Sequence, residues 1–200
     1  MPRPRNQAER RAQLIDAAAR AVISTGATAL KLRDVAAEAE VTPASVLYYY
    51  ADLQELFSAV FEHAAATYFG TREEAIAAAE GPVERLRACI RSGVPWPGAG
   101  ERSTRLLFEL FPVALRNEAV GRAHRVFVDE QTDLYRQVLA DGEDLGLFTL
   151  GASPRALARS FVALEDGYAM DLLIGTATAA EIEARLLDHA RAVTGSPAFA

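Results

Sequence analysis

The residues with the clearest capacity for chemistry lie in the segment PASVLYYY, residues 43–50. Three consecutive residues on a helix span about 200°, so the three tyrosine rings cannot all be buried on one face. Small residues early in such a helix allow close approach to base edges, and tyrosine hydroxyls can donate hydrogen bonds to phosphates. We therefore predict that Tyr50 turns inward as a core residue. The predicted DNA-contacting face of this helix consists of Pro43, Ala44, Ser45, Tyr48 and Tyr49.

Two short helices must position this face, one over residues 32–39 and one over 43–50. Thr42 can cap the second helix with its hydroxyl, and Pro43 can fill its first position, where no amide hydrogen is missed. The pair, joined by a three-residue break, has the dimensions of a helix-turn-helix. Helices this short need support, which we expect from neighbouring helices through Val35, Ala39, Val46 and Leu47.

Charge is distributed unevenly along the chain. The net charge is −6, yet residues 1–50 contain seven basic and five acidic side chains, a balance of +2 that leaves −8 for the remainder. This asymmetry indicates a basic module joined to an acidic body with a different role. The predicted DNA contacts therefore also include Lys31, Arg33 and Thr42. Arg3 and Arg5 lie in a proline-containing arm that we expect to be too short to fold. This arm either adds contacts to DNA or is a solvated terminus without a role.

The rest of the chain is predicted to be helical, because Val, Ile and Thr never cluster into the alternating runs that indicate strands. We predict an all-α fold of about nine helices. An N-terminal three-helix helix-turn-helix domain spans residues 1–51, and the start of the fourth helix, to about residue 60, packs with it. A larger C-terminal helical domain for ligand binding and dimerisation spans residues 52–200. The predicted helices span 9–25, 32–39, 43–50, 52–80, 81–93, 101–117 (kinked or ended near Pro112), 118–141, 153–175 and 178–194.

The first 60 or so residues resemble the DNA-binding domain of the TetR family of transcriptional repressors. That family's signature reads approximately T-x-x-x-I-A-x-x-A-G-V-S, followed by x-G-x-L-Y-x-H-F-x-x-K-x-x-L. The spacing matches without a gap. The corresponding residues here are Val35 and Ala36 for Ile-Ala, Val41 and Thr42 for Val-Ser, Tyr49 for His, Tyr50 for Phe, and Leu56 for the last Leu.

Five positions depart from this pattern. Lys31 replaces a capping threonine and could still reach a phosphate, whereas Leu53 replaces a phosphate-contacting lysine and cannot. Glu40 stands in place of the turn glycine, which predicts a slightly different backbone there. The remaining departures are Ala44 in place of a glycine and Leu47 in place of a tyrosine.

The resemblance implies a small-molecule pocket in the C-terminal domain and a homodimer interface formed by the last two long helices. The apolar stripes of 153–175 and 178–194 support the interface independently, because each is wider than one partner helix can cover. A two-fold dimer predicts a palindromic operator. The candidate ligand-binding residues are Trp96, Phe108, Phe111, Phe127, Tyr135, Phe161, Glu165, Asp166 and Tyr168.

Three carboxylates interrupt the apolar run LEDGYAMDLLIG: Glu165, Asp166 and Asp171. Buried carboxylates need partners, for which Arg105, Arg159 or a cationic effector are the candidates. Cationic effector recognition is one hypothesis. The other is that these carboxylates lie at a dimer seam or on the helix surface.

Other protein classes fit the sequence poorly. His63, His124 and His189 have no metal-ligand spacing, and no nucleophile or phosphate-loop motif occurs, so we predict no enzyme, no cofactor and no metal site. No apolar run is long enough for a membrane span and no signal peptide is recognisable, so a cytoplasmic protein is expected. A single cysteine, Cys89, excludes an internal disulfide. The main alternative is a DNA-binding dimer without small-molecule control.

Overall fold

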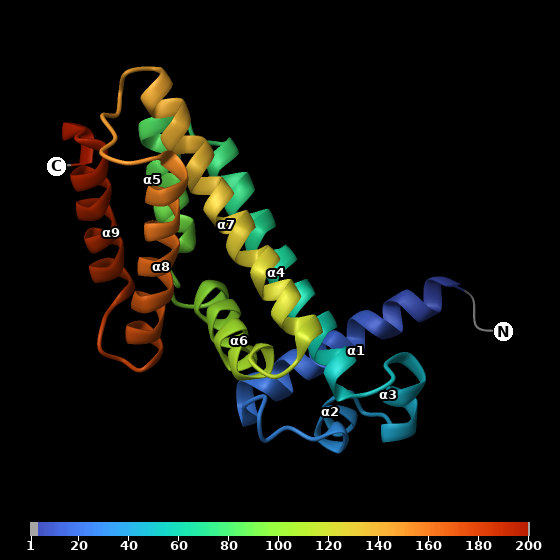
Figure 1. Cartoon of the computed structure of the whole chain (residues 1–200). Helices are drawn as coiled ribbons and strands as arrows, with labels where there is room; N and C mark the ends of the chain where they lie inside the picture. The colour runs from blue at the N-terminus through green and yellow to red at the C-terminus, as the bar shows by residue number, and fades with distance from the viewer. Residues whose placement is uncertain (1–3, 200) are drawn as a thin grey trace. The chain divides into compact units, whose positions relative to one another are not determined.

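The computed structural model describes residues 4–199, and in that range it contains α-helices, one short 3-10 helix and no strand (Figure 1). The predicted all-α fold with an N-terminal helix-turn-helix is confirmed. The elements are α1 (Pro4–Thr25), α2 (Leu32–Glu38), α3 (Pro43–Tyr49), α4 (Leu53–Ala77), α5 (Gly81–Gly93), α6 (Ala99–Ala114), α7 (Glu118–Asp144), α8 (Pro154–Leu173), α9 (Ala179–Thr194) and η1 (Pro197–Phe199).

The helix ends follow local capping chemistry. The Thr42 hydroxyl accepts a hydrogen bond from the Ser45 amide at 3.2 Å, as expected for the first residue before α3. Thr178 and Glu181 form the predicted reciprocal capping box at the start of α9. Gly195 ends that helix with a φ of 62°, in the left-handed region. These ends could be predicted because the partners lie within three or four residues of each other.

One predicted boundary was wrong. Helix α1 begins at Pro4, so Arg5 belongs to a helix and not to an unfolded arm, while Arg3 lies outside the described residues. Helix α6 was predicted to kink or end near Pro112, and it ends two residues later, at Ala114. The proline removes one amide donor close to the end of that helix, where few helical hydrogen bonds remain to be lost.

The chain packs as two compact units. One contains the chain up to Ala66 together with Arg105–Arg125, and the other contains Thr67–Thr104 together with Val126 and the residues after it. Helices α4, α6 and α7 each contribute residues to both units. This is a division by packing, whereas the predicted division at residues 51 and 52 is one of function and stays a prediction.

In the first unit, α2 packs against α1 and against α3. Val35 and Val46 are fully buried there, and Tyr50 is only 1% exposed, which confirms its predicted inward position. Leu47 was expected to support the short helices, but its side chain is 47% exposed. That expectation was wrong, because Leu47 follows the buried Val46 and points to another side of α3.

The turn between α2 and α3 contains Glu40 with a φ of 54°. A glutamate therefore adopts the left-handed conformation that favours glycine, at a cost in free energy. The backbone there makes the kind of turn that a glycine would make, in place of the different turn that the sequence suggested.

In the second unit, the core is formed by α5, α7, α8, α9 and η1, and α9 packs against α5 and α8 (Figure 1). Leu86, Ile90, Tyr135, Phe161 and Leu186 are fully buried in it. Across the described part of the chain, no helix is both long and apolar enough to cross a membrane.

Candidate nucleic-acid interface

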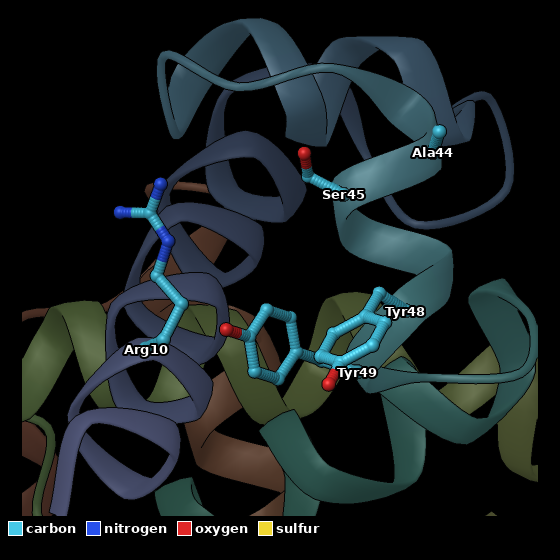
Figure 2. A pocket seen from close by; sticks show the side chains of 5 residues that line it. All are labelled: Arg10, Ala44, Ser45, Tyr48 and Tyr49. Atoms are coloured by element: carbon cyan, nitrogen blue, oxygen red, sulfur yellow. The ribbon is translucent and has the colours of Figure 1, made fainter. Parts of the chain in front are cut away.

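An open hollow of about 440 Å³ lies between α1 and α3 (Figure 2). We call it the α3 hollow. Arg10 projects into it from α1, across from the polar side chains of α3. Its lining residues are Arg10, Ala44, Ser45, Tyr48 and Tyr49.

The geometry of α3 presents hydroxyl groups at the α3 hollow. Tyr48 is 65% exposed, and its ring meets that of Tyr49 edge to face, with ring centroids 5.0 Å apart. This contact limits the orientations that the two rings can adopt. Ser45 Oγ lies 3.0 Å from Thr42 Oγ1. Thr42, predicted to contact DNA, therefore also has a structural role as the cap of α3.

Tyr50 anchors the end of α3 to α1. The Arg11 guanidinium lies over the Tyr50 ring, 4.3 Å from its centroid, and Arg11 Nη1 donates to the Tyr49 carbonyl oxygen at 2.7 Å. The Tyr50 hydroxyl donates to the Arg11 carbonyl oxygen at 3.4 Å. Burial raises the pKa of Tyr50, so it stays a neutral phenol at physiological pH. The positions of Tyr48 and Tyr49 therefore depend on the buried Tyr50.

The other predicted DNA-contacting residues are solvent-exposed. Lys31 and Arg33 lie at the start of α2, where Asp34 accepts a hydrogen bond from the Lys31 amide at 2.8 Å and lies 3.6 Å from the Arg33 guanidinium. Pro43 is exposed at the first turn of α3. Arg10 was not among the predicted residues. The excess of basic side chains over residues 1–50 was the available signal, but the packing of α1 against the helix pair decides which of them faces α3.

The second unit contains a buried polar cluster, which we call the Arg72 cluster. The Arg72 side chain is fully buried, and that of Glu165 is 4% exposed. Arg72 Nη1 lies 3.0 Å from Glu165 Oε2, and Nη2 lies 3.1 Å from Oε1. The cluster joins α4, α5, α7 and α8 and consists of Tyr68, Arg72, Cys89, Gln131, Tyr135 and Glu165.

Hydrogen bonds surround this ion pair. Arg72 Nη2 donates to the Cys89 carbonyl oxygen at 2.9 Å, and Arg72 Nη1 donates to the Tyr68 hydroxyl. The Tyr135 hydroxyl donates to Glu165 Oε1 at 2.5 Å. Gly93 makes room for the carboxylate, because a Cβ atom there would lie 1.8 Å from Glu165 Oε1.

Burial and the ion pair set the ionisation of the cluster. Burial alone would lower the pKa of Arg72, but Glu165, together with Tyr68, Cys89 and Tyr135, more than offsets this effect and holds that pKa well above its ordinary value. Burial, followed by the Glu165 charge, raises the pKa of Tyr135. Burial also raises the pKa of the Cys89 thiol to about 11. The cluster therefore contains one cation, one anion and neutral hydroxyl and thiol groups.

The partner of Glu165 is a correction to the sequence interpretation. Arg105 and Arg159 were the expected cations, but Arg72 fills this role. Arg159 instead stabilises the charged form of Asp166. Burial and the Glu165 charge outweigh this effect and raise the pKa of Asp166 to about 6.

The nine predicted ligand-binding residues belong to both units. Phe108 and Phe111 belong to the first unit, where Phe111 packs edge to face on His124. Phe127, Tyr135, Phe161 and Glu165 are buried in the second unit, and Trp96, Asp166 and Tyr168 are half-buried there. Their role in ligand binding stays a prediction.

Two family models match the chain. Residues 14–60 match the family described as bacterial regulatory proteins of the tetR family, and residues 82–195 match the family described as the C-terminal part of BetI-type transcriptional repressors. The chain belongs to the TetR family of transcriptional regulators. No curated protein shows significant sequence similarity to it. Among residues 4–199, no group of three or more His, Cys, Asp or Glu side chains is arranged to hold a metal ion.

Solved structures share this TetR fold. A TetR transcription regulator from Haloarcula marismortui is 20% identical, with a TM-score of 0.84 over 94% of this chain and 99% of that one. A protein from Saccharomonospora viridis, described as a transcriptional regulator and solved with choline, is 17% identical, with a TM-score of 0.84 over 90% and 95%. AibR, solved with isovaleryl coenzyme A and operator DNA, is 19% identical, with a TM-score of 0.69 over 87% and 94%.

Proposed function

We propose that this TetR-family protein is a repressor that binds a palindromic operator as a homodimer and is released from it by a small-molecule effector. The α3 hollow carries the DNA-binding part of the proposal. It combines a cation from α1 with hydroxyl groups from α3, and the small side chain of Ala44 leaves the helix surface open. Cations and hydroxyls are the groups that proteins use to contact phosphates.

We assign roles to four of the five lining residues and to three residues near the α3 hollow. Arg10 and the Tyr48 hydroxyl contact backbone phosphates, and Ser45 contacts a phosphate or a base edge. Ala44 and the exposed Leu47 lie three residues apart on α3, where apolar side chains can contact thymine methyl groups. Lys31 and Arg33 add charge at the start of α2.

The dimer is proposed to form through α8 and α9. These helices carry apolar side chains that their own chain covers incompletely: Leu157, Leu164, Leu172, Leu187 and Val193 are partly buried, and Met170 and Ile174 are exposed. A two-fold interface would bury them against the same residues of a second copy. It would also present two copies of α3 at a spacing of about 34 Å, one turn of DNA.

Effector control is supported by proteins of similar fold that were solved with small molecules, choline in one case and isovaleryl coenzyme A in the other. In this chain α4 is the covalent route for such control. It begins at Leu53, shortly after the end of α3, and it carries Arg72 in the second unit. An effector with different affinities for two positions of α4 would shift the population of DNA-binding dimers.

The test is binding to a duplex selected from a random-sequence pool by the purified protein. Fluorescence anisotropy over a series of salt concentrations should give saturable binding, with log K falling linearly against log salt. Arg10→Ala should weaken binding and reduce the salt slope by about 1. Tyr48→Phe should weaken binding by at least about tenfold, because one hydrogen bond to a charged phosphate is lost.

Arg122→Ala is the matched control. Arg122 is an exposed arginine of the same unit that pairs with Glu118 and does not line the α3 hollow, so its removal should leave affinity nearly unchanged. Equal losses for Arg10→Ala and Arg122→Ala would refute the assignment of the α3 hollow. Equal affinity for a full palindrome and an isolated half-site would refute the dimeric mode of binding.

A further inference from the structure

The Arg72 cluster contains two buried hydrogen-bond donors without a partner, Arg72 Nε and Gln131 Nε2. We propose that these two groups recognise the effector, and that the effector is an uncharged, largely apolar molecule that presents a carbonyl oxygen to them. The proposal rests on the proposed effector control and names the chemical class of the ligand and the groups that select it.

The two unpartnered donors belong to side chains that touch each other. Gln131 Oε1 accepts hydrogen bonds from the Tyr68 hydroxyl at 3.2 Å and from Arg72 Nη1 at 3.5 Å. These bonds fix which end of the Gln131 amide is the oxygen, so the amide nitrogen is the end left unpaired. Leaving a buried donor unpaired is costly, and one carbonyl oxygen has two lone pairs with which to accept from both donors.

Charge balance selects a neutral ligand. Arg72 and Glu165 already neutralise each other at 3.0 Å, with side-chain exposures of 0% and 4%. A carboxylate or phosphate placed here would leave one buried negative charge unpaired, and an ammonium would leave one positive charge. An ammonium would also find the Glu165 carboxylate occupied by Arg72 and by the Tyr135 hydroxyl. A carbonyl oxygen satisfies the donors without changing the net charge.

The surroundings of the cluster are aromatic and apolar. Tyr68 packs on Phe69 and Phe127, with ring centroids 5.8 and 5.3 Å away. Tyr135 stacks on Phe161 at 4.6 Å with an angle of 9° between the rings. A ligand that reaches the two donors would therefore lie next to these rings, which favours an aromatic or aliphatic body behind its carbonyl group.

Four probes with the same phenyl ring and four-carbon chain test the proposal. Butylbenzene has no polar group, benzylacetone has a ketone, phenylbutyrate is an anion and phenylbutylammonium is a cation. Dissociation constants for the DNA-free protein are measured by ligand-observed NMR. Benzylacetone should bind about tenfold more tightly than butylbenzene, since it gains the donors' hydrogen bonds. Both charged probes should bind more weakly than benzylacetone.

The variant Gln131→Glu replaces the unpartnered amide nitrogen by an oxygen of similar size. The advantage of benzylacetone over butylbenzene should fall below about threefold in this variant. Gln137→Glu is the matched control, because Gln137 is exposed on the same helix, and it should keep the full advantage. If Gln131→Glu does not fold, the comparison of the four probes on the wild-type protein still tests whether the site prefers a neutral carbonyl compound.

Several results would overturn the proposal: equal binding of the ketone and the hydrocarbon, preferential binding of a charged probe, a ketone advantage that survives Gln131→Glu, or no binding of any probe. A crystal structure in which one ordered water satisfies both donors in the presence of saturating benzylacetone would also overturn it. Failure of sequence-specific DNA binding would instead refute the proposed function. DNA release by a molecule whose effect is unchanged in Gln131→Glu would refute only this inference.

Discussion

Removal of one partner of the Arg72–Glu165 pair should destabilise the protein far more than removal of both. Arg72→Met leaves the buried Glu165 carboxylate with the Tyr135 hydroxyl as its remaining hydrogen-bond donor among the cluster's side chains. Glu165→Leu leaves a buried guanidinium whose remaining acceptors are neutral: the Cys89 carbonyl, the Tyr68 hydroxyl and Gln131 Oε1. Either change isolates a charge in the core, whereas the double variant removes both charges.

The magnitude follows from the burial of the pair. Breaking a buried ion pair by removing one partner costs about 3–5 kcal/mol, and replacing both partners by apolar residues costs much less. We therefore expect about 3–5 kcal/mol for each single variant. The double variant should be less destabilised than the sum of the two by at least about 2 kcal/mol.

The measurement is urea unfolding followed by circular dichroism, at one fixed protein concentration because the proposed dimerisation would contribute to the apparent stability. The pair Arg91–Glu183 is a matched control. Its nitrogen and oxygen atoms are also 3.0 Å apart, but its side chains are 67% and 21% exposed. Exposed pairs of this kind contribute less than about 1 kcal/mol.

Equal losses from the buried and the exposed pair would refute this reasoning, because the two pairs share a distance and differ in burial. Additive losses in the double variant would refute it as well, because an isolated charge would then cost no more than a paired one. Either result would mean that water reaches Arg72 and that the core around it is open.

Three further substitutions should change stability in predictable directions, each measured by urea unfolding. Gly93→Ala should lower the free energy of unfolding by about 1–3 kcal/mol, because the new Cβ atom would lie 1.8 Å from Glu165 Oε1. Glu40→Gly should stabilise the protein by about 0.5–1 kcal/mol, because it relieves a φ of 54° in the turn before α3; a loss would contradict the left-handed turn. The folded-state pKa of Asp166 is raised from 3.8 to about 6 by burial and by Glu165, so the stability linked to its protonated form is present below 3.8 and is lost as pH rises through about 6. Asp166→Asn should therefore stabilise the protein by about 1–2 kcal/mol at about pH 8 and have little effect below about pH 4, and an equal effect at both pH values would be contrary to this shift.

The sequence was most informative where structure depends on near neighbours. Helix α3 begins at Pro43 as predicted, since Thr42 supplies the cap and the proline needs no amide hydrogen bond. The inward position of Tyr50 was also predicted correctly, because three adjacent tyrosines cannot share one helix face. Both inferences required only the geometry of a single helix.

The sequence was least informative where the partner lies far along the chain. Glu165 was recognised as a carboxylate that needs a partner, but 93 residues separate it from Arg72. Arg72 is followed by Glu73 and Glu74, both exposed, so its local sequence is typical of a solvated helix surface. The packing of four helices around its side chain is what makes it a core residue. Arg10 was missed for the same reason, since its neighbours on α3 come from a separate helix.

The position of each tyrosine determines what its hydroxyl can do. The Tyr48 hydroxyl belongs to a side chain that is 65% exposed, and it is available to a phosphate. The Tyr50 hydroxyl is used within the first unit, where it joins α3 to α1. The Tyr135 hydroxyl donates to Glu165 and compensates part of a buried charge.

Helix α4 leads from the end of α3 to the Arg72 cluster. It starts just after α3, and at Arg72 it is held by groups from α5, α7 and α8. The unpartnered donors of Arg72 and Gln131 leave this contact between α4 and α7 short of hydrogen bonds in the absence of an acceptor. A ligand that supplies an acceptor gains free energy only in the arrangement of α4 that presents both donors to it, so binding there must favour one arrangement over others. The effector chemistry and the control of DNA binding are therefore both expected to depend on the same arginine.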